Sequence, residues 1–358
     1  MSMCEKIIYK QNLNNNVEIF KRVCGKAKLC AVVKANAYGF GVENIVPLIK
    51  NKVDYFAVAN YVEAVMVRTF TNKPILILGE IEKEDILDAI KNNISLSVSN
   101  FSKLKQIEKI AKTNNMVALV HFKINTGMNR LGFSDIKKFK EAFNFFYYSK
   151  NIRYEGIFSH IYNSTCLTDT LKQQSVFEEF LQSVNSKNLI KHIACTNVVL
   201  GYPNLKYDMC RVGIGLYNYA KENEFGLKSI IKLKSKIINI INVKKGQRVG
   251  YGSNYVCNKR TKVAVVAIGY ADGFFRQLSN SGKVIINNQF CNIIGNVCMD
   301  MCFVDCSNVK VKIGDYATIL GQSGELNINP CSMAEQLQTI DYEILTNLKN
   351  DRMNVLII

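Results

Sequence analysis

The sequence contains no apolar run that approaches the roughly 20 residues a helix needs to cross a bilayer. Its first residues, MSMCEKIIYK, also lack the apolar stretch of a secretory signal. The twelve cysteines of the 358-residue chain have no paired spacing, which is typical of reduced thiols rather than of a disulfide framework. These absences predict a cytoplasmic protein without a membrane span or disulfide staples.

Histidine is scarce, with three in the chain, and none lies near the one suggestive cysteine cluster. That cluster is Cys298, Cys302 and Cys306, on a stretch with the pattern of a strand. Because all three positions are even-numbered, their side chains share one face of the strand, where we expect them to pack. We therefore predict no metal site.

The formal charge of +17 raises the question of nucleic acid or a membrane surface as a partner. The sequence, however, has no arginine-rich run with interleaved aromatic residues, and no basic stripe long enough to lie on a membrane. Its lysines are spread along the whole chain. We expect neither partner, and the charge favours solubility and small anionic ligands.

Short apolar runs alternate with amphipathic segments of helical period from residue 29 to about 218, which is the pattern of repeated βα units. Eight such units close naturally as a (β/α)8 barrel of the TIM type, so we predict an α/β fold. The eight predicted strands are LCAVVK (29–34), YFAVA (55–59), PILILG (74–79), ISLSV (94–98), MVALVHFK (116–123), YEGIFSH (154–160), KHIAC (191–195) and DMCRVGI (208–214).

Beyond residue 224 the helical period largely disappears, and apolar runs are broken by Gly, Asn and Asp. This pattern predicts a mostly β second domain. We place the barrel at residues 1–223 and the second domain at residues 224–358. The first few residues, EKIIYK, are a candidate strand that could join either half.

One lysine, Lys34, lies at the end of the first predicted strand, just before the glycine-containing turn of AVVKANAYGFG. Apolar surroundings lower the pKa of a lysine, which can then form a Schiff base with a carbonyl cofactor. The alternative is a solvated surface lysine. Barrels of this kind build their active sites at the carboxyl ends of the strands. Four further polar residues lie at strand ends or on the last strand: Arg130, His160, Thr196 and Arg211.

The string AVVKANAYGFG resembles the lysine motif of the alanine racemase family, whose members bind pyridoxal 5'-phosphate (PLP). The resemblance implies that Lys34 carries the cofactor and that Tyr38 reaches its phosphate. CRVGIGLYN resembles the family segment whose arginine, here Arg211, faces the pyridine nitrogen. A guanidinium donates a hydrogen bond but transfers no proton, which favours proton return over transamination. The alternative for Arg211 is an ion pair with a carboxylate such as Asp208.

Neutral donors for a phosphate follow the last two predicted strands. The side chain of Thr196 and the backbone at Gly213 and Ile214 can donate to phosphate oxygens. His160, at the end of the sixth strand, is expected against the cofactor ring. These residues complete the predicted cofactor site.

Inversion at the α-carbon needs a proton removed on one face and delivered on the other, which one lysine cannot easily do. VGYGSNYV (249–256) resembles the family segment whose first tyrosine, here Tyr251, is the second base and comes from the partner subunit. We therefore expect a homodimer with shared active sites. The resemblance also implies that the side chain of Arg130 and the backbone at Met299 bind the substrate carboxylate. Lys123 matches a lysine that some relatives carry as a carbamate.

The sequence departs from the family pattern at several positions that bear on substrate range and PLP affinity. Asn125 replaces an aspartate common in the family, and Phe40 stands where the motif often has another residue. Cys195 and Thr196 stand where Asn-Ser is usual. NLKNDRMNV has no tyrosine where many relatives use one to bind phosphate.

The resemblance covers nearly the whole chain and implies PLP-dependent interconversion of L-alanine and D-alanine by two opposed acid/base groups, for cell-wall peptidoglycan. Two enzymatic alternatives stay open, a racemase of another amino acid such as serine or lysine and an amino-acid decarboxylase of the same fold. Such decarboxylases depend on a cysteine-bearing partner loop, whereas Arg211 and Tyr251 fit the two-base racemase. A PLP carrier built on the barrel alone would have no use for Tyr251.

Overall fold

A computed structural model describes residues 3–145, 147–217, 225–348 and 350–358. The chain divides into two compact units. The barrel unit contains Asn16–Ala37 and Val42–Leu216, and the β unit contains Met1–Asn15, Tyr38–Gly41 and Tyr217–Ile358. The boundary predicted at 223/224 falls outside the described residues.

The core of the barrel unit is a sheet of eight strands, each at one of the predicted runs, in the order β8-β7-β6-β5-β4-β3-β2-β9 with every pair parallel. Two backbone hydrogen bonds join the ends of this order, from Asp208 N to Lys191 O and from Arg211 N to Ala194 O, each 3.0 Å long. The predicted barrel is therefore confirmed. Its strands are β2 (Lys28–Val32), β3 (Tyr55–Val58), β4 (Ile75–Ile77), β5 (Ile94–Val98), β6 (Ala118–Lys123), β7 (Ile152–Phe158), β8 (Ile190–His192) and β9 (Met209–Val212).

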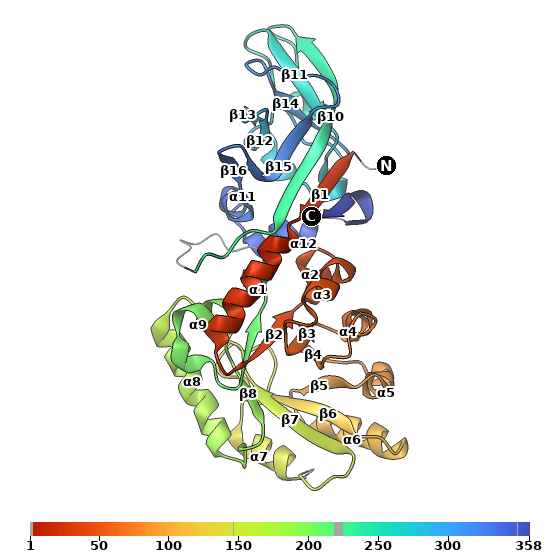
Figure 1. The fold of residues 1–358 in the computed structure, drawn as a ribbon, viewed down its shortest axis with the longest axis vertical. Coiled ribbons are helices and arrows are strands. Elements are labelled where there is room, and N and C mark those ends of the chain that lie inside the picture. The colour runs from red at the N-terminus through yellow and green to blue at the C-terminus, as the bar shows by residue number, and fades with distance from the viewer. Residues whose placement is uncertain (1–2, 146, 218–224, 349) are drawn as a thin grey trace. The chain divides into compact units, whose positions relative to one another are not determined.

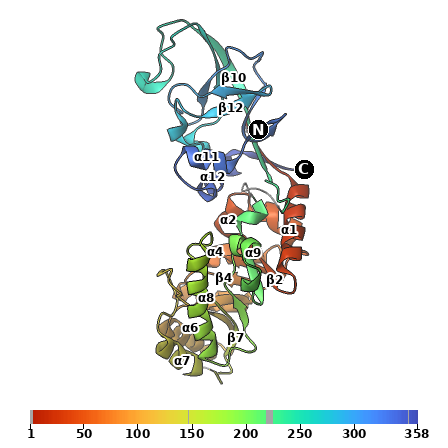
Figure 2. The same ribbon diagram turned by 90° about the vertical axis from the view of Figure 1, so that its left-hand side faces the viewer.

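Helices lie around the outside of this sheet (Figures 1 and 2). Because side chains of the strands are covered on both faces, every residue of β3, β4 and β5 is buried. Asn60 and Asn100 cap two of the helices by accepting from Glu63 N and Lys103 N, which fixes where those helices begin. The helices are α1 (Lys10–Cys24), α2 (Lys34–Tyr38), α3 (Val42–Ile49), α4 (Tyr61–Arg68), α5 (Lys83–Lys91), α6 (Phe101–Thr113), α7 (Ile136–Phe145), α8 (Leu167–Gln182), α9 (Thr196–Gly201) and α10 (Ile214–Tyr217).

The β unit is organised by one long strand, β10 (Ile231–Val243), which pairs antiparallel with β1 (Cys4–Ile8), β15 (Tyr316–Ser323) and β11 (Thr261–Val266). The first strand of the chain, left open by its sequence, thus joins this sheet. Helices α11 (Pro330–Gln336) and α12 (Asp341–Asn347) pack side by side (Figure 2). The remaining strands are β12 (Lys283–Ile286), β13 (Gln289–Asn292), β14 (Cys302–Asp305), β16 (Leu326–Ile328) and β17 (Asn354–Ile357).

All twelve cysteines are free thiols, and nine of them are buried, as expected for small core residues. Cys298, Cys302 and Cys306 are among the buried ones. Within the described part of the chain, no group of His, Cys, Asp and Glu side chains is arranged to hold a metal ion. Nor does any helix in those residues combine the length and the apolar composition that crossing a membrane requires.

Candidate active site

A left-handed turn follows Lys34 directly, within α2 (Lys34–Tyr38). The four residues 35–38 have φ values between 52° and 56°. Each non-glycine residue in this conformation costs about 1–2 kcal/mol, so other contacts must hold the turn. Asn36 supplies one of them, because its Oδ1 accepts from Val42 N at 2.8 Å. The backbone therefore turns sharply at the point where Lys34 leaves the barrel strand.

Glu63, on α4, holds the backbone beside Lys34. Its Oε1 accepts from Ala35 N at 2.7 Å and its Oε2 accepts from Ala59 N at 2.8 Å, so one carboxylate ties the loops after β2 and β3 together. Burial lowers the pKa of Lys34, Arg130 lowers it further, and Glu63 opposes them. The net direction is downward, as the sequence analysis expects for a reactive amine.

Arg211, on β9, is 4% exposed and points its guanidinium at groups of neighbouring strands. It donates to His192 Nδ1 at 2.7 Å, to His192 O at 2.9 Å and to Ser159 O at 2.6 Å. A longer contact of 3.5 Å reaches His160 Nδ1. The alternative pairing with Asp208 is wrong, since Asp208 accepts from Lys191 N at 2.8 Å instead.

Basic side chains gather in the barrel unit. Burial, together with Arg130 and Arg211, lowers the pKa of Lys123 to about 8. Burial, together with the same two arginines, lowers the pKa of His160 to about 3, so this imidazole is neutral. An arrangement of this kind is complementary to anions such as phosphate or carboxylate. Five basic side chains interact electrostatically here: Lys34, Lys123, Arg130, His160 and Arg211.

Arg130 is exposed and lies in a loop that Asn125 organises. Asn125 Oδ1 accepts from Gly127 N at 3.2 Å and from Asn129 N at 2.9 Å. Its Nδ2 donates to Asn129 Oδ1 at 3.0 Å and to Ser134 Oγ at 2.9 Å. An aspartate could make the first two contacts but could not donate the last two. Because the Ser134 hydroxyl could instead donate to an aspartate, asparagine adds one bond to the loop that carries Arg130, the bond to Asn129 Oδ1.

Thr196 begins α9 and reaches the segment after β9. Its Oγ1 accepts from Gly213 N at 3.3 Å and from Gly215 N at 3.5 Å. The backbone donor of Gly213, predicted to bind phosphate, is thus engaged by Thr196. A phosphate at Gly213 N would have to replace or share this long hydrogen bond. Ile214, the next residue, begins α10.

Tyr38 belongs to the β unit, where it is 5% exposed and packs against other tyrosines. Its ring centroid lies 4.8 Å from that of Tyr217 and 5.9 Å from that of Tyr342. Tyr342 is on α12, outside the segment NLKNDRMNV in which the sequence analysis finds no tyrosine. The structure therefore brings two further tyrosines, neither of them predicted, to Tyr38.

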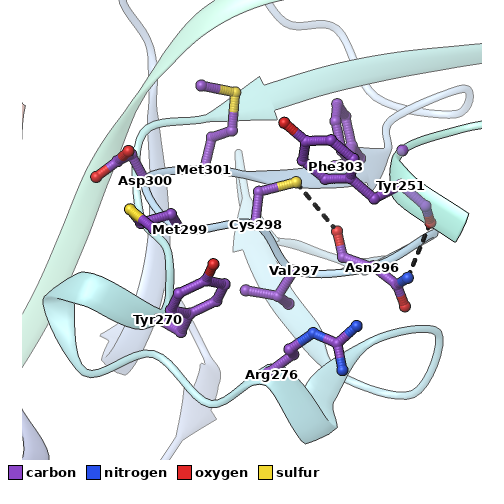
Figure 3. Close-up of a pocket in the computed structure, with 11 residues that line it drawn as sticks. Tyr251, Tyr270, Arg276, Asn296, Val297, Cys298, Met299, Asp300, Met301 and Phe303 are labelled. Atoms are coloured by element: carbon purple, nitrogen blue, oxygen red, sulfur yellow. Dashed lines mark hydrogen bonds between the residues drawn. The ribbon is translucent and has the colours of Figure 1, made fainter.

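The β unit contains a pocket of about 740 Å³ in which two predicted residues, Tyr251 and Met299, lie (Figure 3). Tyr251 is 76% exposed, and its backbone oxygen accepts from Asn296 Nδ2 at 2.8 Å. Tyr270 lies beside Met299 in this view. The pocket is lined by Gly250, Tyr251, Tyr270, Arg276, Asn296, Val297, Cys298, Met299, Asp300, Met301 and Phe303.

Two loops of this pocket are held against each other by their backbones. Tyr270 N donates to Cys298 O at 3.0 Å, and Ala271 N donates to Met299 O at 2.9 Å. Gly269 makes this approach feasible, since a Cβ there would lie 2.2 Å from Met299 O. The backbone at Met299 is therefore fixed by its neighbours.

An arginine outside the pocket ties the same two loops together. Arg352 Nε donates to Asp272 at 2.8 Å, and Arg352 Nη2 donates to Asp300 at 2.6 Å. Asp272 also accepts from Gly269 N at 2.9 Å, which extends this ion-pair network to the glycine contact. No local motif marks this arginine, because its partners are 80 and 52 residues away.

Predicted residues divide between the two units. Lys34 and six others lie in the barrel unit. Three lie in the β unit: Tyr38, Tyr251 and Met299. His121 and His192 are not among the predicted residues, although two histidines within apolar strand runs of a chain that has three were an available signal. The six are Arg130, His160, Thr196, Arg211, Gly213 and Ile214.

Comparisons with known proteins match both parts of the chain. Residues 8–221 match the family model "Alanine racemase, N-terminal domain", and residues 230–356 match "Alanine racemase, C-terminal domain". The chain is 36% identical to an alanine racemase of Francisella philomiragia, over 97% of each chain.

Solved structures of alanine racemases are also similar to this chain. The structure of an alanine racemase from Clostridium difficile 630 has 31% sequence identity and a TM-score of 0.92, covering 100% of this chain and 96% of that chain. An alanine racemase from Bartonella henselae, solved with covalently bound pyridoxal phosphate, shares the fold at 24% identity and a TM-score of 0.91, with full coverage of both chains. On the two family models and the relative at 36% identity, this chain belongs to the alanine racemase family.

Proposed function

We propose that this protein interconverts L-alanine and D-alanine with PLP as its cofactor. The observation that carries the proposal is the group of basic side chains around Lys34 and Arg211, in a chain that belongs to the alanine racemase family. These side chains suit both a phosphate and a substrate carboxylate. When bound, the cofactor holds the amino acid through its aldehyde carbon and takes up electron density from the α-carbon.

The barrel residues have separate roles in this proposal. Lys34 Nζ would hold the cofactor and carry a proton to or from one face of the α-carbon, and burial lowers its pKa, which raises the share of neutral amine relative to an exposed lysine. Arg211 would donate to the pyridine nitrogen without giving up its proton. The neutral imidazole of His160 would lie against the ring, and Arg130 would bind the carboxylate of the substrate.

Phosphate binding would involve Thr196, Gly213, Ile214 and Tyr38. Thr196 Oγ1 already gathers two backbone donors at the start of two short helices. The ring of Tyr342 lies 5.9 Å from that of Tyr38, which makes Tyr342 a candidate to assist Tyr38 in place of the tyrosine absent from NLKNDRMNV.

The second acid/base group would be the phenol of Tyr251, with the backbone at Met299 binding the substrate carboxylate. Both lie in one pocket, and the exposure of Tyr251 leaves its hydroxyl free to meet a substrate. Family resemblance supports a homodimer in which the Tyr251 phenol serves the partner's barrel. We place the reaction in the cytoplasm, where free thiols are stable, and its product in peptidoglycan synthesis.

Chiral analysis in deuterated water tests the reaction itself. The PLP-loaded protein is incubated with L-alanine, and D-alanine and α-deuterium are scored together. We expect D-alanine that carries deuterium at the α-carbon, because racemisation exchanges that proton with solvent. Bound PLP without D-alanine would contradict alanine as substrate, and parallel incubations with serine and lysine would identify a racemase of either one.

Two substitutions test the acid/base pair. Lys34→Ala should abolish covalent retention of PLP, whereas Lys28→Ala, at the opposite end of β2, should retain it. Tyr251→Phe should leave PLP bound and stop conversion of L-alanine to D-alanine, while Tyr148→Phe, at an 89% exposed tyrosine, should convert normally. Conversion retained by Tyr251→Phe would remove the two-base assignment.

A further inference from the structure

The barrel interior holds a chain of polar contacts that the proposed reaction does not use. It starts at Arg211, which donates to His192 Nδ1 at 2.7 Å. The other ring nitrogen of His192, Nε2, lies 2.9 Å from Nδ1 of His121. Nε2 of His121 in turn faces the Tyr55 hydroxyl at 3.4 Å and Glu155 Oε2 at 3.8 Å. The contacts therefore lead from Arg211 to a carboxylate on β7.

The chemistry of the donors and acceptors fixes the direction of the hydrogen bonds in this series of contacts. A guanidinium only donates, so Nδ1 of His192 must accept and carries no proton. His192 and His121 are fully buried, and burial lowers the pKa of both, that of His121 to about 4, so both rings are neutral. The proton of His192 is then on Nε2, which makes this atom the donor to His121. By the same argument, His121 carries its proton on Nε2 and directs it toward Tyr55 and Glu155.

The backbone is shaped to receive the His121 ring. The register between β6 and β7 shifts between Val120 and His121, an irregularity that re-aims a side chain. Opposite the ring, Gly156 has no side chain, and a Cβ there would lie 2.3 Å from Nδ1 of His121. His192 is held as well, because it stacks on Phe158 with ring centroids 4.9 Å apart and planes 5° apart.

Glu155, at the far end of this series of contacts, is held in place by three side chains. Glu155 Oε2 accepts from Ser95 Oγ at 2.6 Å and from the Tyr55 hydroxyl at 3.3 Å, and Glu155 Oε1 accepts from Arg153 Nη2 at 2.9 Å. Interiors of such barrels are usually filled by branched apolar side chains, and buried polar groups are costly unless each is satisfied. A polar interior that connects directly to Arg211 therefore calls for a reason other than packing.

We propose that His121 is a positioning residue for the racemase reaction: anchored at Glu155, it holds His192 in the Nε2–H tautomer and thereby keeps the Arg211 guanidinium in place. The inference rests on the proposed function, since it assumes that Arg211 serves the pyridine nitrogen. Without an acceptor at position 121, the Nε2–H of the buried His192 loses its partner, which costs free energy unless the ring moves its proton to Nδ1. That proton would face a donor of Arg211, and the guanidinium would have to turn away.

Nitrogen NMR of the PLP-loaded, full-length protein with 15N-labelled histidine tests the tautomers. The chain has three histidines, and His121→Asn and His160→Asn each remove one set of signals, which assigns the remaining set to His192. We expect His121 and His192 to show protonated Nε2 and bare Nδ1, unchanged between roughly pH 6 and pH 9, where ordinary histidines complete their titration. A proton on Nδ1 of either ring, or a charged imidazolium in this range, would overturn the proposal.

Three variants connect the tautomer to the reaction. His121→Leu removes the acceptor and should change the nitrogen signals of His192, shift the absorbance of bound PLP and lower kcat by roughly tenfold to hundredfold, the range seen when the partner behind a metal-ligating histidine is removed. His121→Asn retains an acceptor and a donor and should recover the wild-type signals of His192 and most of kcat. Ser97→Ala removes a buried hydroxyl on β5 that donates to Ile77 O at 2.5 Å and should change none of the three.

The outcomes separate two failures. If His121→Leu folds and binds PLP with unchanged His192 signals and unchanged kcat, His121 has a structural role alone and the proposal is wrong. If the wild-type protein shows both predicted tautomers but forms no D-alanine, the proposed function fails, and with it the link from His121 to a reaction.

Discussion

Replacing Gly269 by alanine should separate the two loops that form the β-unit pocket. A Cβ at this position would lie 2.2 Å from Met299 O and 2.3 Å from Cys298 O. The backbone itself allows alanine, since its φ of −144° and ψ of −169° are extended. Strain therefore comes from the close approach alone, and the loops must move apart by roughly 1 Å.

The expected destabilisation has two sources, broken hydrogen bonds and overpacking. The same two carbonyl oxygens accept from Tyr270 N and Ala271 N at 3.0 and 2.9 Å, and a shift of this size breaks both hydrogen bonds. Two such bonds contribute about 2 kcal/mol, and overpacking costs about 1–3 kcal/mol more. We expect Gly269→Ala to lower the free energy of unfolding by about 3–5 kcal/mol if nothing relaxes, and less if the loops adjust.

Urea unfolding followed by circular dichroism measures this decrease, since the chain has no tryptophan to report by fluorescence. The matched control is Gly201→Ala, at a glycine with open space around its hydrogens, which should be neutral or slightly stabilising. In the enzyme assay, KM for L-alanine should rise several-fold in Gly269→Ala because the backbone at Met299 moves. Equal stability and equal KM in both variants would refute the close-packing argument.

Two further predictions concern the barrel unit. The pKa of Lys123 is lowered to about 8 in the folded protein, so above that pH the unfolded chain binds more protons than the folded protein does. The free energy of unfolding should therefore rise with pH, by about 2 kcal/mol between about pH 7.5 and 9.5. Lys123→Met should abolish this rise in urea midpoints, and an identical rise in the variant would contradict the assignment. Asn125→Ala removes four hydrogen bonds from the Arg130 loop and should raise KM for L-alanine several-fold, more than Asn125→Asp, which can keep all but the bond to Asn129 Oδ1. The reverse order would rule out a positioning role for Asn125.

Much of the barrel can be predicted because its signals are local. Eight apolar runs followed by helical periods give the strands, and the rule that sites form at carboxyl ends of strands then groups Lys34, His160 and Thr196. The outcome for Arg211 shows the limit of this reasoning. Its sequence neighbour Asp208 is a plausible partner, yet the guanidinium bonds to His192 on the adjacent strand, since the barrel closes between β8 and β9.

Other features have no local signal. The turn at residues 35–38 adopts left-handed φ values that alanine and tyrosine disfavour by themselves, and distant contacts such as that from Glu63 hold it. The engagement of Gly213 N by Thr196 and the contact between Tyr38 and Tyr342 also join residues far apart in sequence. Such contacts depend on how the loops fold back, which periodicity does not encode.

Short-range hydrophobic patterns and motifs are enough to predict the barrel strands, the mostly β character of the second half and the segments that relate the chain to its family. Tertiary structure alone decided how His121 on β6 meets His192 on β8 across the barrel interior, with β7 between them in the sheet. Contacts of this kind depend on strand register and barrel closure, where a shift of one residue turns a side chain to the opposite face.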